Sequence, residues 1–186
     1  MKKYLLILIV LVLIIPFTAF AEEKTLVGEG VDHGGYGGFV VKFMSIGGDL
    51  GVIVGGRGGW IINHTFVIGG GGYGLANDIT INGNNLNLDY GGFELEYIWR
   101  SDSVLHFTIH FGIGGGKVEM IDGAYVSDEF FYMEPTFNGE LNLLKWFRIN
   151  AGVGYFWVDN IQGMPGLSSS DVRGITGTIV FKFGWF

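Results

Sequence analysis

The sequence predicts an all-β protein: an eight-stranded antiparallel up-and-down transmembrane β-barrel that follows a cleaved signal peptide. Three observations support this prediction. The chain begins with an export signal, and eight later segments alternate apolar and polar residues at period two. After the signal, no apolar run reaches the length of a membrane helix. The 186 residues are enough for one domain.

The amino-terminal segment has the three parts of a secretory signal. Lys2 and Lys3 precede an apolar run at 4–16, and Ala19-Phe20-Ala21 gives a small-x-small cleavage site. The short run and this site favour a cleaved signal peptide at 1–21 over an uncleaved membrane anchor. Residues 22–34 are polar and contain glycine, and we expect a flexible periplasmic lead-in there. The barrel is predicted over 35–186.

The segment 104–113 carries the clearest strand pattern. Alternate side chains of a strand point to opposite faces, so this segment has one apolar face and one polar or small face. About ten residues is also the length that a tilted strand needs to cross a bilayer. We interpret the apolar face as directed outward into lipid. That face holds Leu105, Phe107, Ile109, Phe111 and Ile113, and the other holds His106, Thr108, His110 and Gly112.

The same alternation predicts seven further strands. With the opening one, the predicted strands cover 35–45, 50–61, 65–75, 86–99, 104–119, 128–144, 147–158 and 172–186. Long and short connections alternate, as in outer-membrane barrels. The short turns are 62–64, 100–103 and 145–146, which we place on the periplasmic side. The longer loops are 77–85, 121–127 and 159–171, which we place outside, and the turn 47–49 is unexpectedly short for that side.

The inward faces of these strands collect charges of both signs in equal number. Unpaired charges are costly in a low-dielectric interior, whereas paired ones are tolerated. An eight-stranded barrel is just wide enough for side chains to fill it, so we interpret the set as a polar plug. A narrow proton or ion path is the alternative. The predicted lumen network is Lys42, Arg57, Glu94, Glu96, His106, His110, Glu134, Glu140, Arg148 and Lys182.

Several tryptophans and tyrosines fall near the predicted strand ends. Their rings have an apolar body and a polar tip, which suits the headgroup zone of a membrane. Ordinary core aromatic residues are the alternative interpretation. The predicted aromatic girdle is Trp60, Tyr97, Trp99, Trp146, Tyr155, Trp157 and Trp185.

Composition excludes several classes of site. The chain has no cysteine, which removes disulfides and thiolate sites. Removing Lys2 and Lys3 with the signal leaves 11 − 2 = 9 basic and 18 acidic residues, a net charge of −9, so nucleic acid is not an expected partner. His106 and His110 lie about 13 Å apart along a strand and cannot chelate one metal ion together. Glu94 and Glu96 lie about 7 Å apart, and we expect a structural role for them. No catalytic, cofactor or metal residue is predicted.

The export signal, the eight strands and the aromatic strand ends resemble those of the small outer-membrane barrels of the OmpX, OmpW and opacity type. The best local match is Val180-Phe181-Lys182-Phe183-Gly184-Trp185-Phe186. The resemblance implies that Phe186 is the assembly signal read by the barrel assembly machinery, and that outer-membrane lipids surround the barrel. The pattern departs from that family in phase, because Lys182 and Gly184 fill positions at which the family prefers aromatic or apolar residues.

Function is predicted more coarsely than fold. The first hypothesis is a non-enzymatic outer-membrane protein of a two-membrane bacterium, with a structural or surface-interaction role and an unknown surface ligand. A narrow channel is the second hypothesis. A lipid A-modifying membrane enzyme is the third, although it needs a histidine with a serine or glutamate partner near the outer rim. A soluble lipocalin-like barrel is the fourth, and it would bury Phe107, Ile109 and Phe111 and expose His106 and His110.

Overall fold

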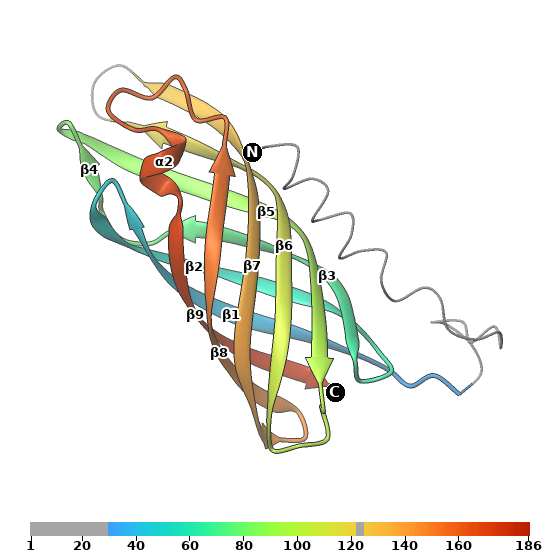
Figure 1. Cartoon of the computed structure of the whole chain (residues 1–186). Helices are drawn as coiled ribbons and strands as arrows, with labels where there is room; N and C mark the ends of the chain where they lie inside the picture. Colours follow the sequence, from blue (N-terminus) through green and yellow to red (C-terminus); the bar gives the residue numbers. More distant parts are fainter. Residues whose placement is uncertain (1–29, 122–124) are drawn as a thin grey trace, which may run out of the picture. The chain divides into compact units, whose positions relative to one another are not determined.

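The structure, a computed structural model, describes residues 30–121 and 125–186. The predicted signal peptide at 1–21 and residues 22–29 of the predicted lead-in lie outside the described residues. The described part is almost entirely β-structure (Figure 1). Its elements are β1 (His33–Ile46), β2 (Asp49–Ile62), β3 (Phe66–Leu75), β4 (Thr80–Ile81), β5 (Asn84–Trp99), β6 (Leu105–Met120), β7 (Val126–Leu144), β8 (Phe147–Asp159), α2 (Ser169–Val172) and β9 (Gly174–Trp185).

Eight of these strands form a closed antiparallel barrel. Each long strand pairs with the next along the chain, including β3 with β5 across the loop that holds β4. The first and last strands close the ring, with Gly35 opposite Trp185 and Phe43 opposite Gly177. Closure removes the unpaired edges that an open sheet would present. The predicted fold class is therefore confirmed for the described residues.

Two turns at one end show how local sequence sets the hairpins. Gly47 and Gly48 join β1 to β2 with φ of 61° and 97°, a left-handed pair that favours glycine in a two-residue hairpin turn. Asn82 and Gly83 adopt φ of 50° and 81° between β4 and the start of β5. The sequence predicts a polar loop over 77–85. The structure corrects this prediction, because Asn82-Gly83 extends a small hairpin beyond the barrel.

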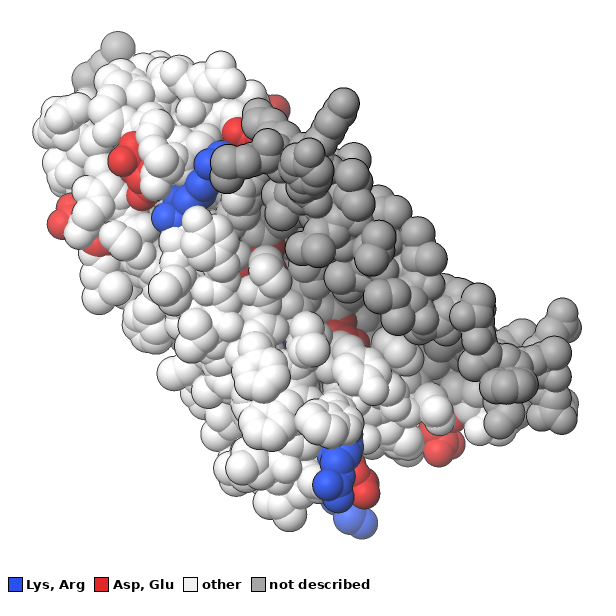
Figure 2. All heavy atoms as spheres, viewed as in Figure 1, with Lys and Arg blue, Asp and Glu red and all other residues white. Residues whose placement is uncertain are grey.

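The outer wall of the barrel is apolar along its middle. The exposed residues there alternate with buried or half-buried ones, for example in β6 and β8, as the period-two pattern predicts. On the face shown in Figure 2, charged side chains gather mainly toward the two ends. Exposed wall residues include Phe39, Phe43, Phe66, Ile68, Phe93, Leu95, Phe107, Ile109, Phe137, Val153, Ile175, Ile179 and Phe183.

The interior has three layers, and the sequence predicts only the middle, charged one. An apolar layer fills the end with the longer loops, hereafter the loop end, and consists mainly of Val40, Met44, Ile53, Tyr73, Leu88, Tyr90, Val118, Phe130, Tyr132, Phe156, Val158 and Val180. A smaller apolar cluster lies toward the opposite end, hereafter the turn end, and contains Tyr36, Ile61, Val67 and Ile98 with Phe186 packed against it. The charged layer therefore lies between two apolar ones.

In the part of the chain that the structure describes, no helix is both long and apolar enough to cross a bilayer. The short helix α2 follows a loop that folds over the loop end (Figure 1).

Candidate functional site

The charged layer is built from side chains that come from strands far apart in sequence. All ten residues of the predicted lumen network are buried inside the barrel. Lys42 on β1 forms an ion pair with Glu134 on β7, and the Thr176 hydroxyl donates to the other Glu134 oxygen at 2.9 Å. The Lys42 ammonium also lies 3.8 Å from the centre of the Tyr73 ring. This pair is thus enclosed by a hydroxyl and an aromatic face.

A second set forms a chain of alternating charges toward the turn end. Arg57 Nη2 lies 3.7 Å from Glu96, whose other oxygen accepts from Lys182 at 2.6 Å. Lys182 also pairs with Glu140, and Arg148 Nη1 donates to Glu140 at 3.1 Å. The order is Arg57, Glu96, Lys182, Glu140, Arg148. Each carboxylate lies between two cations, which is the arrangement that makes burial of charge tolerable.

The two inward histidines contact different carboxylates. His106 Nε2 lies 3.1 Å from Glu140, while its Nδ1 lies 3.0 Å from the Ser103 carbonyl oxygen. His110 Nε2 lies 3.1 Å from Glu94, which also accepts a hydrogen bond from the Tyr73 hydroxyl. The histidines therefore contact separate carboxylates. Within residues 30–121 and 125–186, no group of three or more metal-ligating side chains comes together.

A glycine on the facing strand makes room for Glu94. A Cβ atom added to Gly71 would lie 2.5 Å from Glu94 Oε1 and 2.6 Å from the Tyr73 hydroxyl. The next residue, Gly72, points the other way, and an added Cβ would meet nothing within 4 Å. The glycine run of β3 thus has an inward position where a methyl group would displace the ends of the Glu94 and Tyr73 side chains, and an outward one that tolerates a methyl group.

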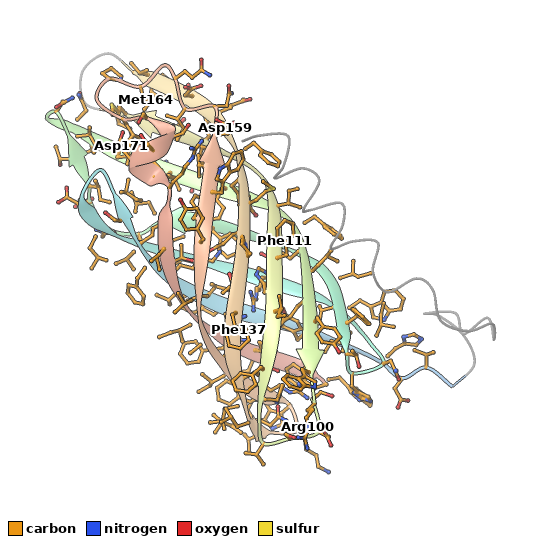
Figure 3. The ribbon with its side chains drawn as sticks, viewed as in Figure 1. Arg100, Phe111, Phe137, Asp159, Met164 and Asp171 are labelled. Atoms are coloured by element: carbon orange, nitrogen blue, oxygen red, sulfur yellow. The ribbon has the colours of Figure 1, made fainter. Side chains whose placement is uncertain are left out.

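The loop between β8 and β9 covers the apolar layer at the loop end. It places Ile161, Met164 and Leu167 in that layer, and Val172 of α2 joins them (Figure 3 labels Met164). The backbone N–H groups of Gln162 and Gly163 donate to Asp128 at 2.8 Å.

Helix α2 is held at both its start and its carboxyl end. The Ser168 backbone N–H and hydroxyl donate to Asp171 at 2.8 and 2.6 Å, which lowers the pKa of that carboxyl below its ordinary value. The Asp171 carbonyl oxygen accepts from Gly47 at 2.9 Å. These bonds connect the loop and helix to the β1–β2 turn.

The turn end carries a hollow of about 880 Å³ at the mouth of the barrel. Arg148 reaches it from inside, with its guanidinium 4.1 Å from the centre of the Phe186 ring. Lys145 stands at its rim with the indoles of Trp146 and Trp185. The end of the alternating charge chain therefore opens onto this hollow.

The predicted aromatic girdle is uneven. Trp60, Tyr97, Trp99, Trp146 and Trp185 are exposed near the turn end, whereas Tyr155 and Trp157 lie toward the loop end. Trp157 is half-buried, against Phe131 and Arg173.

Phe186, the predicted assembly signal, follows β9 and turns its ring inward. The ring stacks on Tyr36 with centroids 6.2 Å apart. In β9 itself Lys182 is buried while Phe183 and Trp185 are exposed, which agrees with the predicted faces of this strand despite its unusual phase.

Comparison with known proteins gave structural matches only: no protein-family model and no curated protein matched the sequence. The structure is similar to Neisserial surface protein A, with a TM-score of 0.60 at 13% identity over 84% of this chain and 99% of that one. It is similar to the N-terminal β-barrel domain of Pseudomonas aeruginosa OprF, with a TM-score of 0.58 at 10% identity over 82% and 97%.

A third similar structure is Ail, the attachment invasion locus protein of Yersinia pestis, with a TM-score of 0.51 at 15% identity over 85% of this chain and all of that one. At these identities the likeness establishes the fold and not the activity. Eight strands, closure between first and last, and the length covered all agree. The chain therefore has the fold of the small eight-stranded outer-membrane β-barrels.

Proposed function

We propose that this chain is an integral outer-membrane β-barrel with a sealed interior and a structural or surface-interaction role. The observation that supports it most strongly is the apolar outer wall combined with the enclosed charges. A soluble monomer rarely exposes an apolar patch of more than a few hundred Å². Here Phe107 and Ile109 are exposed, while His106 and His110 are buried. The soluble lipocalin-like alternative requires the reverse arrangement.

The layered interior favours a sealed barrel and argues against a conducting channel. An ion that entered from the loop end would have to leave water and cross the layer around Tyr90, Tyr132 and Phe156, whose rings lie 4.9 to 5.4 Å apart. Moving an unpaired charge into such a medium is very costly. The charges in the middle layer are also held by one another. We infer that they stabilise the barrel and do not conduct.

The placement of the histidines does not favour the enzyme alternative. A lipid A-modifying site needs a histidine near the outer rim with a partner that activates it. His106 and His110 are buried beside Glu140 and Glu94 inside the barrel. His33 and His64 flank the turn end, which we place on the periplasmic side. We therefore propose a role without catalysis.

The loop end supports contact with a neutral or cationic surface partner. One Ail structure holds sucrose octasulfate, a heparin analogue. Such a polyanion would be repelled here. Among the described residues at the loop end, the acidic residues outnumber the basic ones, which are Lys117 and Arg173. Those acids are Asp49, Asp78, Asp89, Glu119, Asp128, Glu129, Asp159 and Asp171.

Two measurements on the full chain test this proposal. In the native host, the protein should fractionate with the outer membrane, and its gel mobility should change on heating. In planar bilayers, the folded barrel should leave the baseline conductance unchanged. Recovery from the soluble periplasm would contradict the membrane location, and discrete conductance steps would contradict the sealed interior.

A further inference from the structure

We propose that the hollow at the turn end binds a phosphate group, with Arg148 and Lys145 as its cationic ligands. This inference depends on the geometry of the mouth and not on the membrane location proposed above. The hollow measures about 880 Å³, within the range of about 300–1,000 Å³ that is usual for ligand pockets. Its size alone does not identify a ligand, but its two cationic side chains indicate an anion.

The charge of the mouth follows from the alternating chain inside the barrel. That chain contains three cations, Arg57, Lys182 and Arg148, and two carboxylates, Glu96 and Glu140. Glu140 is shared, because Lys182, His106 and Asn150 contact it as well as Arg148. This series of charges therefore ends at the mouth with Arg148. Its one carboxylate partner, Glu140, is shared with several other donors.

The guanidinium of Arg148 is both held in place and accessible. Its side chain is 9% exposed, its Nη1 is bonded to Glu140, and the Phe186 ring covers one face. Glu140 is the one acceptor of this side chain among the described residues. The remaining N–H groups of a guanidinium form a rigid fork, which fits phosphate oxygens in pairs. Packing therefore presents an already oriented donor set to the hollow.

The rim adds a second cation and an interfacial setting. Lys145, in the β7–β8 turn, lines the same hollow and is exposed. An ammonium on a flexible stem serves as a mobile point charge for a phosphate. Among the described residues no Asp or Glu side chain lines the hollow, and the one acidic group of its lining residues is the terminal carboxylate of Phe186. Trp146 and Trp185 flank the site, and tryptophan is typical of the headgroup level of a membrane.

Two sources share this chemistry: a phospholipid headgroup and free phosphate. The test uses the full chain folded in maltoside micelles, which contain no phosphate. It is titrated with dihexanoyl phosphatidylglycerol, with inorganic phosphate and with acetate, while ³¹P line broadening and protein chemical shifts report binding. We expect saturable binding of at least one phosphate compound and much weaker binding of acetate. Binding of the lipid alone would assign the site to a headgroup, and equal binding of inorganic phosphate would assign it to a soluble anion.

Variants separate this site from general attraction to a cationic surface. Lys145→Gln should weaken the phosphate Kd about twofold to fivefold, as for an exposed ion pair. Arg148→Lys keeps the charge but removes the fork, and should weaken it about tenfold. Arg100→Gln is the matched control, because Arg100 belongs to the neighbouring turn and does not line the hollow (Figure 3). It should leave the Kd unchanged.

Heat-modifiable gel mobility of each variant shows that the barrel has folded, so that a lost signal is not misread as a folding defect. Three results would overturn the proposal: no saturable phosphate binding by the folded wild type, equal loss in Arg100→Gln and Lys145→Gln, or acetate binding as tight as phosphate. Unchanged phosphate affinity in folded Arg148→Lys would remove the guanidinium from the site.

Discussion

At the residue scale, Glu140 is the carboxylate on which the interior depends most. It is fully buried and contacts Lys182, Arg148, His106 and Asn150. Glu140→Gln would leave two buried cations with one carboxylate fewer. Removing one partner of a buried pair costs about 3–5 kcal/mol. We expect a loss of that order in the free energy of unfolding, measured by urea denaturation in lipid vesicles.

Glu129→Gln is the control for this prediction. Glu129 is also a glutamate of a barrel strand, but its side chain is exposed at the loop end of β7. Surface substitutions usually change stability by less than about 0.5 kcal/mol. Equal stability of Glu140→Gln and Glu129→Gln would show that the charge chain does not hold the barrel.

Neighbouring glycines of β3 give a second matched pair. Gly71→Ala places a methyl group against Glu94 and Tyr73, and overpacking of this kind costs about 1–3 kcal/mol. Gly72→Ala points away from the interior into open space and should be neutral or slightly stabilising. Denaturant midpoints of the two variants check this. Equal midpoints would mean that the space opposite Glu94 is not tightly filled.

At the element scale, the β8–β9 loop should respond to acid through Asp171. The hydrogen bonds from Ser168 lower the pKa of Asp171, so they stabilise the start of α2 above the ordinary aspartate pKa of about 3.9. That contribution is lost as pH falls below this value through the lowered pKa. Amide exchange over 160–173 should therefore show constant protection from pH 7 to 5 and a decrease below about pH 4.

Asp171→Asn should remove that pH dependence and leave the loop less protected at neutral pH. Asp102→Asn, in the turn at the other end, should behave like the wild type. A wild-type loop that stays equally protected down to pH 3 would contradict the role of this carboxylate.

The strands were predictable because apolar residues alternate with polar or small ones along much of each strand. In the first half of β6, exposed Leu105, Phe107 and Ile109 alternate with buried polar residues, which are His106, Thr108 and His110. The hairpin at Thr80–Ile81 was missed, although Asn82-Gly83 is a strong turn signal. The strand beside it is only two residues long and shows no periodicity.

The layering of the interior was not predictable from faces alone. The inward face of β5 changes from Leu88 and Tyr90 to Glu94 and Glu96 along a single strand. Strand tilt and register decide which of these meet residues of other strands. Lys42 and Glu134 are 92 residues apart in sequence and meet only because the barrel closes. From the sequence we can predict equal numbers of opposite charges inside the barrel, but not which residues pair with one another.

At the scale of the whole molecule, we propose that hydrocarbon surrounds the outer wall and that the charged interior is enclosed. The chain has no cysteine, so single cysteines can be introduced as unique probes. Ile109 is 57% exposed on the wall and pairs with Phe137 of the next strand, which Figure 3 labels, and Ser170 is exposed in the loop-end helix. The two positions differ in the solvent that we expect around them.

The most direct measurement is maleimide labelling of Ile109→Cys in intact outer membranes. We predict that a lipid-soluble maleimide reacts and that a charged, water-soluble one does not, while Ser170→Cys reacts with the charged reagent. Reaction of Ile109→Cys with the charged reagent as fast as Ser170→Cys would show that the wall faces water, and would contradict the account.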